Sequence, residues 1–260
     1  MQVTNTGSRL SLDRAQANQQ TQAQNLSSGK HINSAKDDAA GLVISTGLDS
    51  QNRGIGAALR NSFDGISRLQ VEDAALSSVG EDLQRIRELK VQQQNGILSE
   101  DDNQALQAEI DQRLESIDNV FKQSDFNGQS LFKSGQMNIQ SGANAGQSIE
   151  ITSQDLSAQF SAIGVSASDD LKLDALDEAL QVVSTRRSDL GALENRLQGN
   201  TEFLALKSEV IQSANSRIRD TDFAQSVSQK TKADVQFKVA VAVQGQANAN
   251  QQDVLRLLKP

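Results

Sequence analysis

Residues 176–218 read LDEALQVVSTRRSDLGALENRLQGNTEFLALKSEVIQSANSRI and carry the strongest periodic signal in the chain. An apolar residue recurs at every seventh position, which keeps one stripe of a helix facing a partner helix. The stripe consists of Leu176, Val183, Leu190, Leu197, Leu204, Ile211 and Ile218. This spacing predicts one long helix. A second stripe begins at Leu173 and Leu180 but continues into Arg187 and Glu194, so we expect a mixed bundle with a partly wet side rather than a two-stranded coiled coil.

The N-terminal half supplies helices against which this one can pack. Apolar residues between Ile55 and Ile86 keep steps of three, four or seven, and those from Leu106 to Phe121 keep steps of three or four. An Asn-Gly pair at 95–96 interrupts the pattern, and Ser99 followed three residues later by Asp102 is typical of a helix N-terminus. Together the segments predict a three-helix rod.

The middle and the two ends of the chain have different patterns. Apolar residues alternate on both sides of GANAG at 142–146, which predicts a β-hairpin, and the polar stretch 152–170 predicts irregular surface structure. Residues 13–25 contain no apolar side chain larger than alanine and could not hold a helix on a globular core. Valines alternate with other residues over 235–243, a pattern that leaves both strand and helix open.

The residue inventory leaves little material for catalysis or metal binding. The chain has no cysteine and one histidine, His31, which excludes Cys-based zinc sites, thiol nucleophiles and HExxH sites. A calcium loop beginning at Asp101 fails because Ala105 breaks the third ligand position and no glycine follows. We expect the adjacent acids to cap helices or face solvent; they lie at 37–38, 101–102 and 169–170. The sequence therefore predicts no catalytic residue, metal or cofactor.

Composition excludes further classes of function. The only proline is Pro260, so long helices are uninterrupted by the strongest helix breaker. The net charge is −8, and no basic stripe with interleaved aromatic residues is present, which disfavours nucleic-acid binding. No apolar run approaches the roughly 20 residues of a membrane span, and residues 1–10 lack the apolar stretch of a cleaved signal peptide.

Two blocks near opposite ends, LSSGKHINSAKDDAAGLVIS at 26–45 and SRIRDTDFA at 216–224, closely resemble the terminal signatures of bacterial flagellin. Further blocks follow in the family's order: FDGISRLQVEDAAL at 63–76, LQRIRELKVQQQNG at 83–96, SDFNGQSLF at 124–132 and LGALENRLQ at 190–198. The resemblance implies a mainly α fold, an elongated antiparallel helical bundle or coiled coil formed by the N- and C-terminal halves, with a small β-hairpin near the middle. Only a short segment separates the helices, so we expect a core-only flagellin that lacks the variable outer domains.

The resemblance also implies a domain organisation. Residues 1–33 would form the N-terminal part of the inner tail domain D0, residues 34–44 a connector, and residues 221–260 the C-terminal part of D0. Residues 45–220 would form the rod domain D1, with the hairpin at about 136–152. Because the tails are poor in large apolar side chains, we hypothesise that they are disordered in the isolated chain and become helical only when neighbouring copies surround them.

The function implied by the resemblance is structural and not enzymatic. The chain would self-assemble into the helical flagellar filament, which is extracellular and acts as a propeller for motility, after secretion without a cleaved signal peptide. Expected partners are further copies of the chain, a flagellin export chaperone, the flagellar secretion apparatus, and the filament cap and hook-junction proteins. A hook-filament junction protein shares the end-to-end plan, but the full terminal blocks favour flagellin. A small secreted helical binding protein or a hydrolase is the alternative from another class, and a hydrolase would need a catalytic cluster that the inventory lacks.

Three sets of residues carry roles implied by the family. The segment expected in the filament core and under the export chaperone contains Val235, Val239, Val254, Leu255, Leu257 and Leu258. Contact with vertebrate Toll-like receptor 5 is implied for Gln84, Arg85, Leu89 and Glu109. O-linked glycosylation is considered for Ser153, Ser157, Ser161, Ser166 and Ser168. In the receptor motif Lys90 replaces the alanine usual in the family, and Arg85 and Arg87 are otherwise expected to be solvated or to pair with acids of adjacent subunits.

Overall fold

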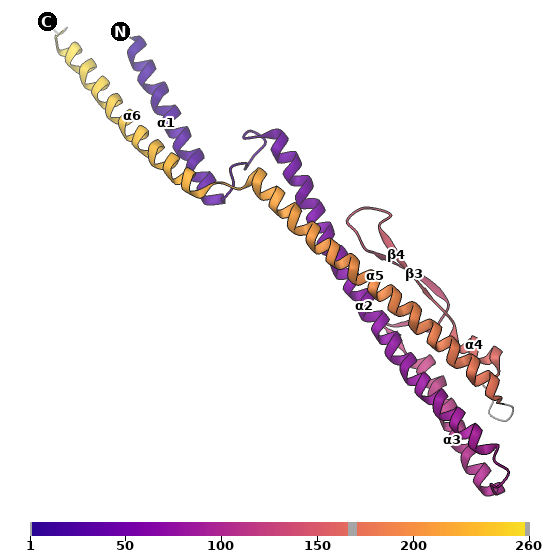
Figure 1. Cartoon of the computed structure of the whole chain (residues 1–260). Helices are drawn as coiled ribbons and strands as arrows, with labels where there is room; N and C mark the ends of the chain where they lie inside the picture. Colours follow the sequence, from indigo (N-terminus) through magenta and orange to yellow (C-terminus); the bar gives the residue numbers. More distant parts are fainter. Residues whose placement is uncertain (1, 166–170, 258–260) are drawn as a thin grey trace. The chain divides into compact units, whose positions relative to one another are not determined.

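The computed structural model describes residues 2–165 and 171–257. Over these residues the chain is mainly α-helical with two small antiparallel hairpins, which confirms the predicted fold class (Figure 1). The helices are α1 (Gln2–Ser28), α2 (Ala39–Gln93), α3 (Glu100–Gln123), α4 (Leu156–Ile163), α5 (Leu173–Arg219) and α6 (Phe223–Leu257). The strands are β1 (Asp125–Phe126), β2 (Gln129–Ser130), β3 (Gly135–Gln140) and β4 (Ser148–Ser153).

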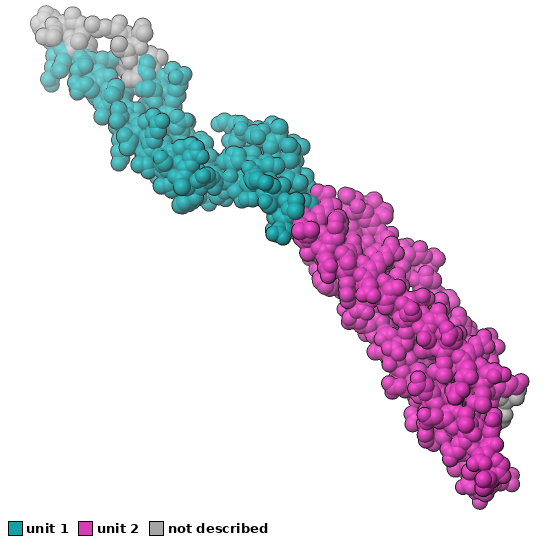
Figure 2. Space-filling view, in the orientation of Figure 1, with its two compact units in different colours: residues 1–50, 209–260 teal, residues 51–208 magenta. Residues whose placement is uncertain are grey.

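The chain divides into two compact units (Figure 2). Unit 1 comprises residues 1–50 and 209–260, and unit 2 comprises residues 51–208. The helix α2 begins at Ala39, inside the segment 34–44 for which a connector is predicted. It starts there because the Asp38 carboxylate accepts a hydrogen bond from the Gly41 N–H at 2.9 Å, as helix-capping side chains do.

The core of unit 2 forms along the predicted stripe of α5. All five stripe residues in this unit are at most 3 % exposed: Leu176, Val183, Leu190, Leu197 and Leu204. The first four of them, Leu176 to Leu197, belong to one apolar cluster with Leu83 of α2 and Ile117 of α3. The second stripe is partly exposed to solvent, as expected, because Arg187 pairs with Asp73 at the surface.

The helix α3 begins with the predicted cap. The Ser99 side chain accepts a hydrogen bond from the Asp102 N–H, and the Asp102 carboxylate accepts one from the Ser99 N–H at 3.1 Å. This reciprocal arrangement satisfies two N–H groups that the helix itself leaves unpaired.

The hairpin β3–β4 is confirmed, with Ile139 opposite Ile149. It packs on α2, where a Cβ added to Gly65 would lie 2.3 Å from the Ile139 Cδ1 atom. The prediction of irregular structure after the hairpin is wrong where α4 forms, because Asp155 caps the helix start and Gly164 ends it at φ 91°. Residues 166–170 of that stretch lie outside the described residues.

Candidate functional site

The helices α1 and α6 of unit 1 lie side by side (Figure 1) and are here called the tail pair. Among their described side chains, the buried ones are all small: Ala15, Ser226 and Ala233. The Gln19 amide donates a hydrogen bond to the Asp234 carboxylate at 2.9 Å, and the Lys230 ammonium donates one at 2.8 Å. The pKa of Asp234 is lowered by the bond from Lys230 and then by that from Gln19. The described contacts of the pair are therefore small buried residues, the Gln19–Asp234 hydrogen bond and half-buried apolar side chains such as Leu12 and Phe237.

The helix α6 leaves most of its described larger apolar side chains in solvent, whereas Phe237 is half-buried. Exposed fractions between 42 % and 66 % are found for Phe223, Val227, Val235, Val239, Val241 and Val243. They lie on more than one face, because steps of four and two residues turn a helix by about 40° and 200°. Val254, Leu255 and Leu257 also belong to α6, whereas Leu258 lies outside the described residues. An extended apolar surface of this kind marks an interaction site.

The ends of the tail pair are fastened by backbone contacts within unit 1. Residues 29–33 meet residues 219–221, and the His31 N–H donates a hydrogen bond to the Arg219 carbonyl at 2.9 Å. The His31 Nδ1 atom lies 3.0 Å from the Asp220 carbonyl oxygen, which only accepts, so Nδ1 carries the proton. His31 is exposed at this position, in the segment that joins α1 to α2.

Of the residues implied in receptor contact, the structure brings Arg85 and Glu109 together. The Arg85 Nε atom donates a hydrogen bond to Glu109 Oε1 at 2.8 Å; this bond is the largest cause of a raised pKa for Arg85 and a lowered pKa for Glu109. Gln84 is exposed beside them on α2. Leu89 is 1 % exposed and belongs to the core, so its side chain is unavailable to a partner without local unfolding.

Ion pairs connect α2 to its neighbouring helices; they lie largely at the surface, except that Asp82 is buried. Arg85 and Arg87, expected to be solvated or to pair with acids of adjacent subunits, are exposed in the single chain, where each also pairs with an acid of the same chain. The interhelical pairs have N–O distances of 2.7 to 2.9 Å and are Arg85–Glu109, Arg87–Asp177, Arg113–Asp82 and Arg187–Asp73. Exposed pairs of this kind typically contribute about 0.2–1 kcal/mol each.

The serines considered for glycosylation occupy different environments. Ser153 is buried, and its hydroxyl accepts a hydrogen bond from Arg68 Nη2 at 2.8 Å, so the structure leaves no room for a sugar there. On α4, Ser157 is half-buried and Ser161 is exposed. Ser166 and Ser168 lie outside the described residues.

A buried ionic cluster escapes the sequence analysis. Arg186 of α5 donates to Glu72 of α2 at 2.8 Å, and Arg68 lies 3.5 Å from the same carboxylate while also holding Ser153 of β4. Burial raises the pKa of Glu72, although Arg186 opposes the shift, and burial lowers the pKa of Arg68. The opposite charges four residues apart on α2 are the only signal in the sequence, and such pairs usually face solvent. The cluster links α5 to α2 through Glu72 and α2 to β4 through Arg68, which indicates a structural role.

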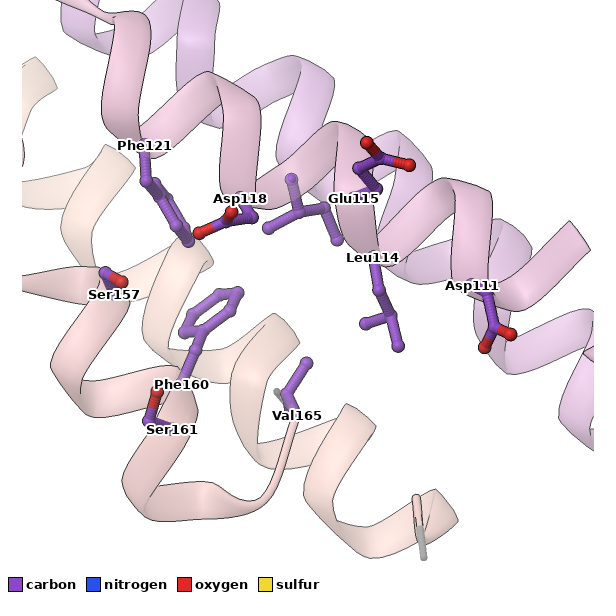
Figure 3. Close-up of a pocket in the computed structure, with 10 residues that line it drawn as sticks. Asp111, Leu114, Glu115, Asp118, Phe121, Ser157, Phe160, Ser161 and Val165 are labelled. Carbon is purple, nitrogen blue, oxygen red and sulfur yellow. The ribbon is translucent and has the colours of Figure 1, made fainter. Parts of the chain in front are cut away.

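A hollow of about 460 Å³ lies between α3 and α4 (Figure 3). The rings of Phe121 and Phe160 meet edge to face there, 5.1 Å apart, and Asp111, Glu115 and Asp118 lie around them. Among the described residues that line the hollow there is no Lys, Arg or His, and the hydroxyl groups are those of two serines, Ser157 and Ser161. Within residues 2–165 and 171–257, no group of three or more His, Cys, Asp or Glu side chains is placed to bind a metal ion. Among the described helices, none combines the length and apolar character needed to cross a membrane.

Known proteins that resemble this chain in sequence and structure cover most of its length. Residues 2–137 match the bacterial flagellin N-terminal helical region, and residues 173–258 match the bacterial flagellin C-terminal helical region. Flagellin of Halalkalibacterium halodurans is 42 % identical, with 90 % of this chain and 89 % of the relative covered. Flagellin of Bacillus subtilis is 35 % identical, with coverage of 98 % and 97 %. The crystal structure of Bacillus cereus flagellin is similar with a TM-score of 0.51 and 27 % identity, over 55 % of this chain and 88 % of that one.

Proposed function

The chain belongs to the bacterial flagellin family and is a structural protomer of the flagellar filament, and we propose that the tail pair is the surface through which its copies associate. The observation that supports this proposal is that the tail pair buries only small side chains, while valines of α6 remain exposed. Helical filaments arise naturally when a contact between different faces of two copies does not close into a ring.

Covering the uncovered side chains of α6 would favour association. Six apolar side chains retain 42 % to 66 % of their exposure in the single chain. Burying a Val or Phe side chain fully is worth about 1.5–3 kcal/mol, so covering the exposed half returns about 1 kcal/mol for each and about 6 kcal/mol for the set. An effect of this size changes an association constant by a factor of about ten thousand.

We propose that the tails gain their stable order from assembly. Three small buried residues cannot offset the entropy of fixing two helices, which costs about 1–2 kcal/mol for each backbone residue. The division proposed is a tail domain of residues 1–33 and 221–260, a connector 34–44 and a rod 45–220. Amide hydrogen exchange of the free subunit and of the filament tests the idea: exchange in residues 2–28 and 223–257 should be fast in the subunit and slow in the filament. Equal protection in both states would contradict it.

Self-assembly itself is tested by seeding. Soluble subunits mixed with short filament fragments should pellet as long fibres that are visible by electron microscopy. Subunits without seeds provide the control for spontaneous aggregation. A chain that stays in the supernatant at every concentration with competent seeds would contradict the proposed role of the tail pair.

We propose that α6 is shielded before assembly by an export chaperone and that the chain leaves through the flagellar secretion apparatus with its N-terminus uncleaved. The exposed Val235 and Val239 provide an apolar surface for such a chaperone. Substituting both with Asp should abolish co-elution with the chaperone, whereas the same change at exposed Val91 of α2 should not. N-terminal sequencing of secreted subunits tests cleavage. The filament cap and the hook-junction proteins are proposed as further partners at the ends of the filament.

We propose that Gln84, Arg85 and Glu109 form the receptor-facing group, and that Leu89 serves only to pack the helix. Reversal of charge in Arg85→Asp should abolish Toll-like receptor 5 signalling. The matched control is Arg187→Asp, because Arg187 has a similar exposure and an equivalent ion pair. Equal signalling by both variants would remove the proposal.

We propose Ser161 and the less exposed Ser157 as the described positions most accessible to O-linked sugars. Intact mass of subunits taken from native filaments tests modification, and peptide mapping locates it. A mass equal to that of the bare chain would exclude it.

A further inference from the structure

Two Asn-Gly pairs, Asn95-Gly96 and Asn127-Gly128, lie at the surface in contrasting environments. A glycine after asparagine leaves the connecting peptide nitrogen unhindered, because glycine has no side chain. Both pairs therefore carry the same chemistry, and any difference between them must come from the surrounding structure.

The first pair lies in the loop between α2 and α3. Asn95 and Gly96 are exposed, and the next residue, Ile97, is 89 % exposed. Within the described part of the chain, no group accepts a hydrogen bond from the Gly96 N–H, and a Cβ added at Gly96 would meet no atom within 4 Å. The Asn95 carbonyl accepts a hydrogen bond from the Leu98 N–H at 3.2 Å, but the Gly96 nitrogen, which is the reacting atom, is held by no hydrogen bond among the described residues.

The second pair forms the turn of the hairpin β1–β2. Asn127 and Gly128 have φ values of 53° and 75°, the conformation that two-residue hairpin turns require. The flanking residues Phe126 and Gln129 are paired, and the Gly128 N–H faces the Asp125 carboxylate at 3.4 Å. This peptide is held by the hairpin.

We propose that Asn95 is a site of spontaneous deamidation, a modification that is independent of the proposed assembly function. A base removes the proton from the Gly96 amide nitrogen, which then attacks the side-chain carbonyl carbon of Asn95. The bond from that carbon to the side-chain nitrogen breaks, and the nitrogen takes a proton and leaves as ammonia. The five-membered imide that results is opened by one water molecule to give aspartate or isoaspartate. No oxidant or reductant is needed.

The folded chain tolerates this product. The capping box of α3 is formed by Ser99 and Asp102 and does not use the Asn95 side chain. A hydrogen bond from the Leu98 N–H to the Asn95 carbonyl, 3.2 Å long, is the contact that an isoaspartate would displace. The new carboxylate lies just beyond the C-terminus of α2, where the helix dipole disfavours negative charge. The modification should therefore alter the loop and its charge while unit 2 stays folded.

The test is a time course on the full-length soluble subunit at mildly alkaline pH, analysed by peptide mapping with mass spectrometry. Asn95 should convert about tenfold faster than Asn127, because reaction at Asn127 requires opening of a hydrogen-bonded turn. In concentrated urea the two rates should become equal. The Gly96→Ala variant should slow reaction at Asn95 alone with an unchanged circular dichroism spectrum, and isoaspartate should be detected by enzymatic carboxyl methylation. Equal rates in the folded chain, a ratio that persists in urea, or an unaffected Gly96→Ala variant would overturn the proposal.

Discussion

Replacing Val235 and Val239 by threonine should weaken filament formation without unfolding the subunit. These residues are 55 % and 56 % exposed in the chain and lie one turn apart on α6. Threonine has the same branched shape as valine and a similar helix propensity, so the change tests burial of apolar surface rather than helix formation.

The expected size follows from desolvation of the two hydroxyl groups. Burying a hydroxyl without a full set of partners costs about 1–3 kcal/mol in proteins. We use the lower end, because a helical threonine can donate to a carbonyl of the preceding turn. Two sites therefore weaken subunit addition by about 2 kcal/mol, which raises the critical concentration about thirtyfold.

The assay is sedimentation after seeding, with the critical concentration measured as the subunit left in the supernatant. The control is Val91→Thr, the same change at a valine of α2 that is 50 % exposed. It should shift the critical concentration by no more than about threefold, as a surface substitution outside the interface does. Thermal unfolding of unit 2 should match the unsubstituted chain in both variants. If the double variant stays within about threefold while its subunit is folded, the reasoning about α6 is refuted.

Three further predictions concern stability, measured by urea denaturation of the full chain. Ser99→Ala should lower the free energy of unfolding by about 1 kcal/mol through loss of the helix cap. The cap holds the pKa of Asp102 below its ordinary value of 3.8, so its contribution should be present above that pH and be lost as pH falls through the lowered folded pKa. Gly65→Ala should destabilise by about 1–3 kcal/mol, because the new methyl collides with Ile139. Gly80→Ala should stabilise by about 0.5–1 kcal/mol, because its nearest neighbouring atom is 3.8 Å away.

Each of these predictions has a distinct contradicting result. For the cap, the difference between the variant and the unsubstituted chain should shrink on acidification, and a difference that grows would be inconsistent with a lowered pKa of Asp102. For the two glycines the signs must differ. Equal effects of Gly65→Ala and Gly80→Ala would show that helix propensity, not contact with the hairpin, controls both sites.

The sequence was most informative where a helix buries one side. The stripe along α5 was identified from spacing alone, and its members from Leu176 to Ile211 are buried. Likewise the Ser99 and Asp102 pair marked the start of α3. Both signals are local in sequence, because they depend on residues three to seven positions apart on one helix.

Features that depend on contacts distant in sequence were missed. The serines of α4 made its sequence look like a loop, although Asp155 and Gly164 mark its ends. The helix is held by contact of Phe160 with Phe121, a residue distant in sequence. The ionic cluster around Glu72 joins residues 114 positions apart, so no local pattern shows that these charges are buried. In the receptor motif, by contrast, Leu89 lies three residues after Ile86, so the spacing of the apolar residues was a signal that it is buried.

The ambiguous valines of α6 have a physical explanation. The periodic spacing of apolar residues identifies a helix when one face is buried and the other is exposed to solvent. The signal is weak when a helix has apolar residues on several faces. Val235 and Val241 lie on different faces of α6, and both stay about half exposed beside α1. A single copy of the chain supplies only one partner for a helix that offers several apolar faces. Assembly would supply other copies of the chain as these partners, in agreement with the proposal that the tails gain their stable order in the filament.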